Sequence, residues 1–304
     1  LAGYDLTKYD RPSVAADVVV FSVMKDDECE DVRRLQEKKL KILLIRRGGF
    51  PYKGSWAMPG GFCRKGEDVI DSARRELCEE TGIDDAYVNL VGVYGEPDRD
   101  PRGWVISSTY MALMNGRDCR LKAGDDAQDA RWFTVELTDV STEVTEAAEV
   151  SGIGVEIVKN EVEASHEVQN VKRYRLVLKN ADSDIKLTAV LRRTDMSSCG
   201  RSSDSYDIEE CEGLAFDHAR IITEAVLGLR EDVRRDMELA FDLLQERFTL
   251  TELQNVYEQI WDMELTTPNF RRKIAEYVEE TDAYQSGERY RPAKLFTRRK
   301  DARK

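Results

Sequence analysis

Three glutamates, Glu76, Glu79 and Glu80, stand at positions i, i+3 and i+4 of one short segment. On a helix this spacing places the three carboxylates on one face, where like charges repel one another. Two of them also fall in the last turn, where the helix dipole is already negative. A divalent cation relieves this conflict, because magnesium binds through a few carboxylates, water molecules and phosphate oxygens of a substrate. The spacing therefore predicts a Mg²⁺ (or Mn²⁺) site.

The glutamates belong to a longer pattern of the form G-x5-E-x7-R-E-U-x-E-E-x-G-U, where U is an aliphatic residue. Every specified position is matched, by Gly61, Glu67, Arg75, Glu76, Leu77, Glu79, Glu80, Gly82 and Ile83. We interpret Glu67 and Arg75 as a structural pair that joins a loop to the helix. The segment resembles the Nudix hydrolase family, and this implies an α/β fold, an α/β/α sandwich in which the pattern forms a loop, a helix and a second loop.

The resemblance also implies a mechanism. By position, Glu76, Glu79 and Glu80 would be the catalytic and metal-binding residues, with the carbonyl of Gly61 as a further metal ligand. Water activated by the metal and a carboxylate would attack one phosphorus of a pyrophosphate. The identity of the base stays open between a glutamate of the pattern and a distant acid, such as Asp125, Asp126 or an acid of the insertion described below.

The surrounding elements are readable from periodicity. Apolar runs of strand length occur at 17–24, 41–46, 87–94, 105–114 and 130–135. Glycines and prolines between residues 48 and 61 indicate a long functional loop. From residue 139 the composition becomes acidic and rich in Ser and Thr, and two alternating runs, 174–178 and 185–191, predict an inserted β-hairpin or a small β-subdomain. The polar stretch SSCGRSSDS after it is expected to be a mobile loop, and helical periodicity returns at 221–244.

The C-terminal segment has sharper local signals. Thr249 and Glu252 have the spacing of a capping box, so a helix is predicted to begin at Leu250. Thr267 is expected to cap a second helix with Pro268 at its first position. A hairpin around residues 286–287 completes the order of a winged helix-turn-helix. We therefore divide the chain into residues 1–138 (Nudix domain), 139–212 (hairpin plus mobile loop), 213–246 (helical segment) and 247–304 (winged helix).

Composition excludes several other kinds of chemistry. The chain of 304 residues has two histidines, which argues against a histidine-ligated zinc centre and a Ser/His/Asp triad. Its six cysteines include no Cys-x-x-Cys pair and are expected to be reduced. No apolar run approaches the roughly 20 residues of a membrane span, so a cytoplasmic protein without membrane contact is expected.

The net charge is −13, yet residues 266–304 hold 11 basic and 6 acidic residues, a local +5. The tail either faces an anion or is merely a solvated basic terminus.

Two flanking stretches, FPYKGSWAMPGGF and GEPDRDPRGWVISSTYMAL, are similar to the ADP-ribose pyrophosphatase branch of the family. This implies a nucleotide-sugar substrate, with ADP-ribose cleaved to AMP and ribose 5-phosphate. The substrate-binding candidates are Arg46, Trp56, Arg99 and Arg102: an arginine can bind phosphate bidentately, and Trp56, Tyr52 or Phe50 can stack on adenine. Each of these residues, taken singly, fits packing or a surface ion pair equally well.

The run GLAFDHARI and the tail resemble Nudix-related transcriptional regulators of NAD metabolism. In such regulators the second helix enters the major groove of double-stranded DNA, and here it would present Asn269, Arg271, Arg272 and Lys273, with Arg289, Arg291 and Lys294 on the wing. A homodimer is expected, because a two-fold regulator reads paired half-sites. The alternative is a winged helix that serves packing or dimerisation. Because the pattern is intact, we rank hydrolysis first and an ADP-ribose-sensing DNA-binding regulator second.

Overall fold

A mixed sheet forms the body of the computed structural model, which describes residues 5, 8–25, 38–83, 86–116, 127–146, 168–198, 201–287 and 290–299. Its main strands run in the order β10-β9-β8-β7-β2-β1-β6-β5. At its centre β1 (Ser13–Lys25) pairs antiparallel with β2 (Lys38–Arg47) and parallel with β6 (Val105–Leu113). β5 (Tyr87–Tyr94) lies at one edge, and the short strands β3 (Trp56–Ala57) and β4 (Gly60–Phe62) pair with β2 and β1.

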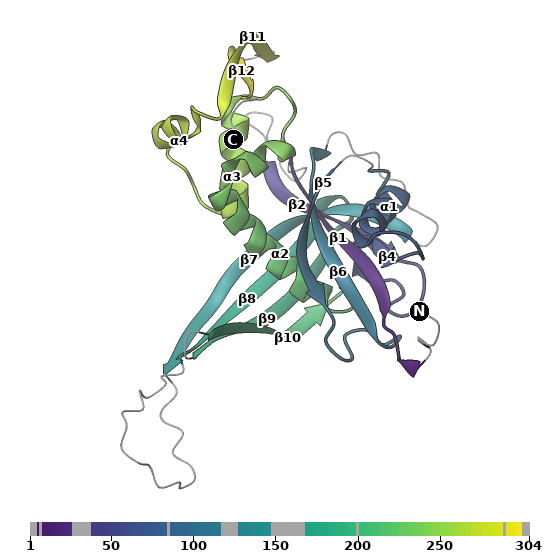
Figure 1. The fold of residues 1–304 in the computed structure, drawn as a ribbon. Helices are drawn as coiled ribbons and strands as arrows, with labels where there is room; N and C mark the ends of the chain where they lie inside the picture. Colours follow the sequence, from purple (N-terminus) through teal and green to yellow (C-terminus); the bar gives the residue numbers. More distant parts are fainter. Residues whose placement is uncertain are drawn as a thin grey trace.

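Helices cover both faces of the central strands (Figure 1), which explains why β1 and β2 are apolar along most of their length. On one face, α1 (Val69–Thr81) packs Ala73 and Leu77 against Val18, Val20 and Leu43 of the sheet. On the other face, α2 (His218–Arg235) buries an apolar stripe that includes Ile222, Val226 and Leu229. The expected α/β sandwich is confirmed.

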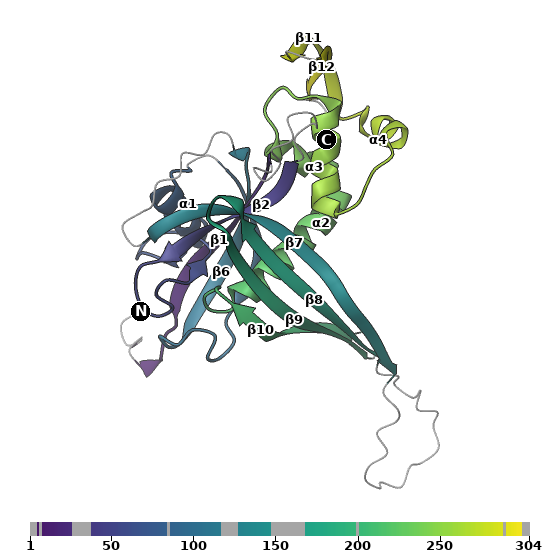
Figure 2. The ribbon, with the colours of Figure 1, turned by 180° about the vertical axis from the view of Figure 1, so that it is seen from behind.

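The inserted residues extend this sheet. β7 (Ala127–Glu146), β8 (Val168–Asn180), β9 (Ile185–Ser198) and β10 (Arg201–Glu212) form an antiparallel ladder that projects from the body (Figure 2), with the 3-10 turn η3 (Ala181–Ser183) between β8 and β9. The expected hairpin is therefore present as β8 and β9. The boundary expected after residue 138 falls inside β7, so the sheet runs through it without a break.

The mobile loop expected at residues 197–205 is wrong over its described part, because Arg201–Glu212 is strand β10. Its polar residues pair across the ladder with β9: Arg192 forms an ion pair with Asp207 at 2.7 Å, and Arg193 lies 3.7 Å from Asp204. Arg192 and Asp207 face each other in the ladder, and opposite charges at such positions stabilise an edge strand that is exposed to water. A composition that is usually typical of loops therefore forms a strand here.

The helix expected at 221–244 ends early. α2 stops at Arg235, because Asp236 takes an extended backbone conformation with φ −128° and ψ 97°. The Asp236 carboxylate accepts a hydrogen bond of 2.9 Å from the amide of Glu238 and so caps the 3-10 helix η4 (Met237–Leu243). This short helix leads directly into the C-terminal elements.

Those elements are α3 (Leu250–Trp261), α4 (Thr267–Ile274), β11 (Val278–Gly287) and β12 (Tyr290–Arg298), in the order of a winged helix. The capping box at Thr249 is confirmed by hydrogen bonds in both directions between Thr249 and Glu252. The second helix is shifted by one residue, since Thr266 is its N-cap, and Pro268 stands one position later than expected. Buried side chains of α3 and α4 belong to the same apolar cluster as α2, so the two halves of the chain share a continuous core.

No helix among the described residues is long and apolar enough to cross a membrane. Three cysteines in the described part of the chain, Cys63, Cys78 and Cys211, are free thiols, as expected for these positions.

Candidate functional site

Local signals fix both ends of α1, the helix that carries the glutamates. At its start the Asp68 carboxylate accepts a hydrogen bond from the amide of Ile70 at 3.4 Å. At its end Gly82 adopts a left-handed conformation with φ 77°, and its amide donates to the carbonyl of Cys78. Glycine suits this position because side chains disfavour a positive φ. The Ala73–Leu77 face is buried against the sheet, and Glu80 is buried beside it at the end of the helix. Glu79 is exposed, on the side that faces the preceding loop.

Glu67 and Arg75 form a bidentate ion pair, with Nε–Oε1 at 2.8 Å and Nη2–Oε2 at 3.0 Å. The Ser72 hydroxyl donates a third hydrogen bond to Glu67 at 2.7 Å. The hydrogen bond from Arg75, followed by that from Ser72, lowers the pKa of Glu67 to about 2. Glu67 is therefore ionised throughout the physiological range, and the pair ties the loop before α1 to the helix.

The other three glutamates differ in their surroundings. Glu80 is only 9% exposed and accepts a hydrogen bond of 2.8 Å from the amide of Gly60. Glu76 packs against Gly61 so closely that a Cβ at Gly61 would come within 2.5 Å of its Oε1. Glu79 is half-exposed and accepts hydrogen bonds from Arg64 at 3.2 Å and from Arg75 Nη1 at 3.1 Å. The same Nη1 lies 2.6 Å from Glu76.

This donor set suits a hard divalent cation in charge and chemistry. Four carboxylates, those of Glu67, Glu76, Glu79 and Glu80, face two guanidinium groups, those of Arg64 and Arg75, which leaves two negative charges in excess. The positions of the side chains do not match a metal site: among the described residues no three Asp, Glu, His or Cys side chains are arranged to hold a metal ion. Arg75 Nη1 lies between Glu76 and Glu79, so a metal ion would have to displace it.

A cavity of about 480 Å³ opens beside the glutamates. Among the candidates from the sequence it includes Gly61, Glu76, Glu80, Arg99 and Arg102 in its lining. Further lining residues come from the central strands, the loop at 48–50 and the segment before α2: Asp17, Arg47, Phe50, Phe62, Ser107, Phe216 and His218. Because these segments are far apart in the sequence, only the folded sheet brings them together.

Four of the metal-binding and substrate-binding candidates do not line the cavity: Glu79, Trp56, Arg46 and Tyr52. Glu79 faces Arg64 and solvent, and Trp56 is a buried core residue whose ring packs edge-on against Phe133. Arg46 is exposed and donates a hydrogen bond to the carbonyl of Gly54 at 3.1 Å. Its neighbour Arg47 lines the cavity instead, because successive side chains of a strand point to opposite faces.

The two arginines of the loop after β5 are already paired. Arg99 holds Asp217 bidentately, at 2.9 and 2.8 Å, and donates to the Ser107 hydroxyl at 2.9 Å. Arg102 pairs bidentately with Asp100, the closest contact being 2.6 Å. Each guanidinium can therefore contact a phosphate only by sharing or exchanging its carboxylate partner.

Phe216 is the centre of an aromatic and cationic stack at this cavity. Its ring lies 4.8 Å from the Tyr52 ring, and the guanidinium carbons of Arg47 and Arg102 lie 4.8 and 5.2 Å from its centroid. The Arg102 guanidinium also covers Phe62 at 4.7 Å. Phe216 and Tyr52 have positive φ, 52° and 59°, which is a strained conformation that tends to occur at functional sites. The sequence analysis missed Phe216, although it noticed the run GLAFDHARI that contains it.

Two titratable groups with shifted pKa values line the same cavity, the buried His218 and the half-buried Asp17. His218 Nδ1 accepts a hydrogen bond of 3.0 Å from the amide of Met58, and burial lowers the pKa of His218 to about 4, so that the ring is neutral. Burial raises the pKa of Asp17 to about 6, against the opposing effects of a Ser107 hydrogen bond and the Arg99 charge. Neither residue was a candidate from the sequence, since nothing local distinguishes it from a core residue.

The basic face expected on the winged helix is exposed on α4. Asn269, Arg271, Arg272 and Lys273 are exposed, whereas Phe270 and Ile274 are buried. Arg272 donates to Asn269 at 3.3 Å, and the Lys273 ammonium lies 5.6 Å from the Trp261 ring. On the wing, Lys294 pairs with Glu280. The side chain of Arg291 lies outside the described residues, as do Arg289 and the acids Asp125 and Asp126.

Comparison with known proteins agrees with this architecture. A family model described as the NUDIX domain matches residues 31–151, and one described as the NrtR DNA-binding winged helix domain matches residues 240–297. The chain is 28% identical to the "ADPR responsive transcriptional repressor NtrR" of Acinetobacter baylyi, over 97% of this chain and 86% of the relative. It is 43% identical to the ADP-ribose pyrophosphatase of Methanocaldococcus jannaschii, over 42% of this chain and 68% of the relative.

Solved structures match over nearly the whole chain. A MutT/nudix family protein from Enterococcus faecalis has a TM-score of 0.61 at 26% identity, over 98% of this chain and 90% of the other. NrtR of Shewanella oneidensis, solved with a 27mer DNA, has a TM-score of 0.56 at 23% identity, over 94% of this chain and 93% of the other, a likeness of fold. The chain therefore belongs to the Nudix family, and it ends in a winged helix domain of the NrtR type.

Proposed function

We propose that this protein is a DNA-binding transcriptional regulator that responds to ADP-ribose. The observation that carries the proposal is the similarity to an ADPR responsive repressor over 97% of the chain, because it includes the cavity and the winged helix together. The sequence analysis ranked hydrolysis first. The full-length relative favours the regulator instead, since the pyrophosphatase relative matches 42% of the chain.

The cavity suits a nucleotide sugar in size and chemistry. At about 480 Å³ it falls within the range of small-molecule sites. Phe50 and Phe62 expose aromatic faces on which a base can stack, and they are 86% and 42% exposed. The pyrophosphate of ADP-ribose would be repelled by Glu76 and Glu80 unless a divalent cation neutralised them. We therefore expect ADP-ribose to bind more tightly with Mg²⁺ or Mn²⁺ than in EDTA.

The exposed face of α4 suits double-stranded DNA. Asn269, Arg271 and Arg272 project from a short helix whose other face is buried, which is the geometry of a recognition helix. Base edges are read by Asn and Arg, and phosphates are held by further cations. We infer that the protein acts as a homodimer on paired half-sites, and light scattering at micromolar concentration tests this: a monomer would contradict it.

The regulator proposal is tested by fluorescence anisotropy with duplex DNA from the region upstream of the protein's own gene. We expect tight, salt-sensitive binding to this duplex, weaker binding to a shuffled duplex of the same composition, and release when ADP-ribose and Mg²⁺ are added. Equal affinity for both duplexes, or binding that ADP-ribose does not alter, would contradict the proposal.

Hydrolysis of ADP-ribose is a second candidate, favoured by the intact pattern on α1 and by the closeness of Glu76 and Glu80 to the cavity. A bound metal would supply an activated water and neutralise charge on the pyrophosphate. Glu80, held by the Gly60 amide, and Glu76, held against Gly61, would be its ligands on the cavity side. Release of AMP from ADP-ribose with Mg²⁺, followed by chromatography, tests this activity.

A further inference from the structure

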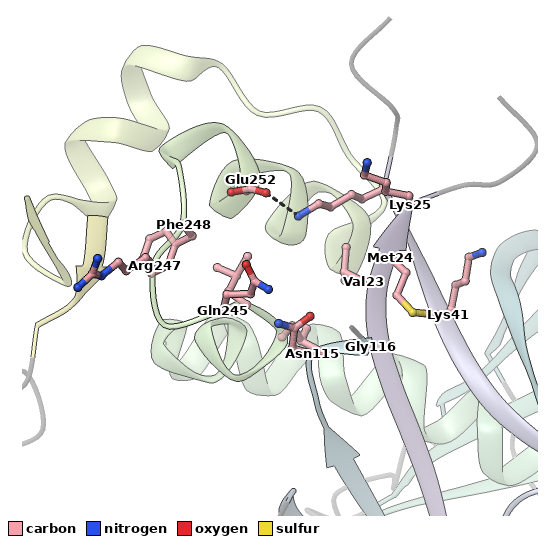
Figure 3. Close-up of a pocket in the computed structure, with 13 residues that line it drawn as sticks. Val23, Met24, Lys25, Lys41, Asn115, Gly116, Gln245, Arg247, Phe248 and Glu252 are labelled. Carbon is pink, nitrogen blue, oxygen red and sulfur yellow. Dashed lines mark hydrogen bonds and ion pairs between the residues drawn. The ribbon is translucent and has the colours of Figure 1, made fainter. Parts of the chain in front are cut away.

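One end of α3, the first helix of the winged helix, is held by the central sheet. Glu252 in its first turn accepts a hydrogen bond from the Thr249 amide at 3.0 Å through Oε2. Its Oε1 accepts a second one, at 3.3 Å, from the ammonium of Lys38, the first residue of β2. This ion pair crosses the junction of the two halves, and a dashed line marks it at Glu252 in Figure 3. Both side chains are largely buried, so the contact is stronger than an exposed ion pair.

The other end of α3 is held by α2. Arg230 Nε donates to the carbonyl of Ile260 at 3.0 Å, and Trp261 Nε1 donates back to the carbonyl of Arg230 at 3.2 Å. The Arg230 guanidinium also lies 3.6 Å from Asp262. The last carbonyls of a helix lack partners within the helix, so Arg230 supplies a donor where α3 requires one. These contacts are reciprocal and fix α2 and α3 relative to each other.

The two elements that hold α3 both reach the cavity with their other end. β2 ends in Arg47, which lines the cavity, and α2 begins at His218, two residues after Phe216. The Arg47 guanidinium lies 4.8 Å from the Phe216 ring, so the cavity ends of β2 and α2 touch each other. Figures 1 and 2 show α2 running from beside the central sheet to α3. An 18-residue helix spans about 27 Å, which covers the distance from the cavity to the winged helix in one rigid element.

The junction on the β2 side is not filled. A cavity of about 230 Å³ lies there between the body and the winged helix. Figure 3 shows it enclosed by Val23 and Met24 of β1 on one side and by Gln245 and Phe248 before α3 on the other. Atoms that border a void lack packing partners on that side. The N-terminal end of α3 is therefore less closely packed on this side than on the side of its buried Leu253.

We propose that β2 and α2 are the two links through which the cavity controls the winged helix, and that Lys38 and Arg230 are the residues that make them. The proposal rests on the regulator function proposed above. A ligand that enters beside Phe216 and Arg47 changes how the cavity ends of α2 and β2 meet. Each link holds one end of α3. The change at the cavity therefore tilts α3, and the recognition helix α4 moves with it. Such coupling is a free energy between two binding sites. A variant can therefore lose the coupling while each site still binds its own ligand.

The test is the coupling factor, defined as the Kd for upstream DNA with saturating α,β-methylene ADP-ribose and Mg²⁺, divided by the Kd without ligand. The methylene analogue avoids hydrolysis during the measurement. Arg230→Met and Lys38→Met are compared with two controls: Arg234→Met one turn further on α2, where Arg234 pairs with Glu231 at the surface, and Lys179→Met, where Lys179 pairs with Glu136 on the sheet extension. Ligand affinity and ligand-free DNA affinity are measured for every variant.

We expect the wild type and both controls to share one coupling factor. In Arg230→Met and Lys38→Met it should fall by about fivefold or more toward 1, while the two separate affinities stay within about twofold. If the wild type responds to the ligand and both variants keep its coupling factor, the proposed links are wrong while the proposed function stands. If the ligand does not change the DNA affinity of the wild type, the proposed function and the proposed links are both wrong.

A second measurement does not depend on the folding of a variant. Hydrogen exchange of the wild type with and without the analogue reports on amide protection at both ends of α3. We expect the ligand to change protection near Glu252 and near Trp261, although neither residue lines the cavity beside Glu76 and Glu80 in which the ligand is proposed to bind. Unchanged protection at both ends, at a ligand concentration that saturates the cavity, overturns the proposal.

Discussion

Glu80 is the most buried of the three glutamates that share one face of α1, and its position is set by the backbone. It lies at the end of α1, 9% exposed, with Oε2 on the Gly60 amide and the cavity beside it. A glutamine at this position keeps an oxygen that can accept the same hydrogen bond, but it removes the charge that a metal requires. The substitution therefore separates a structural role from a chemical one.

We predict that Glu80→Gln lowers Mg²⁺-dependent release of AMP from ADP-ribose by about 100-fold or more, the magnitude typical of a lost catalytic group. The midpoint of thermal unfolding should stay equal to that of the wild type or rise slightly, because one negative charge leaves an acidic cluster. Glu231→Gln on the surface of α2 is the control and should retain full turnover. Unchanged turnover in Glu80→Gln would show that the pattern is not a catalytic site.

His218 makes stability depend on pH in a predictable direction. Burial lowers the pKa of His218 to about 4 from 6.5, so between these values the unfolded chain binds a proton that the folded chain does not. Its contribution to stability is therefore complete above about pH 6.5 and is lost as pH falls toward 4. Asparagine keeps an acceptor for the Met58 amide but does not titrate.

The stability of the wild type relative to His218→Asn should fall by about 2 kcal/mol when pH is lowered from 7 to 5, since one pKa unit corresponds to 1.36 kcal/mol. Urea unfolding of both proteins at the two pH values measures this difference. A difference that is independent of pH would mean that His218 titrates normally and is not buried as described.

At the scale of elements, α3 begins with a capping box that also contacts the central sheet. Thr249 accepts from the Glu252 amide at 3.1 Å, and Glu252 accepts from the Thr249 amide and from Lys38. Thr249→Ala removes the side-chain cap, and we predict a loss of about 1 kcal/mol in the free energy of unfolding. Thr249→Ser keeps the hydroxyl and should lose less. Equal losses in the two variants would show that the methyl group, rather than the cap, matters.

Local signals made several elements predictable. Helix α1 and the capping box at Thr249 depend on residues within a few positions of one another, and sequence patterns record such contacts directly. Strand β10 was mispredicted because its stability comes from β9: the charges of Asp204 and Asp207 indicate a loop until Arg192 lies opposite Asp207 and Arg193 comes within ion-pair distance of Asp204. The shift of the α4 start from Pro268 to Thr267 is a smaller error of the same boundary kind.

Long-range contacts limited what could be predicted of the site. Glu76, Glu80, Gly61, Arg99 and Arg102, which the sequence singled out for metal or substrate binding, all line one cavity, while their roles stay predictions. Arg46 was named as a candidate and Arg47 was missed, because the phase of β2 cannot be read from an apolar run that is buried on both faces. Phe216 and Asp17 were missed because the sheet, and no local motif, brings them to the glutamates.

At the scale of the whole molecule, the acidic body and the basic recognition helix should be separable in function. Arg271 and Arg272 are exposed on α4 and do not line the cavity. We predict that Arg271→Ala/Arg272→Ala weakens binding to upstream DNA and flattens the slope of log affinity against log salt by about 0.9 for each DNA phosphate that the variant no longer neutralises. Any hydrolysis of ADP-ribose should be unchanged. A double variant with wild-type DNA affinity and slope would assign the winged helix to packing alone.

The central claim is that one chain couples a nucleotide cavity to a DNA-binding face, and reciprocity tests it most directly. Thermodynamic linkage requires that if ADP-ribose weakens DNA binding by some factor, DNA must weaken ADP-ribose binding by the same factor. The measurement is the Kd of α,β-methylene ADP-ribose by calorimetry, with Mg²⁺, in the presence and absence of saturating upstream duplex. We predict a Kd that rises with DNA by the factor found in the DNA titrations. An identical Kd with and without DNA would contradict the account.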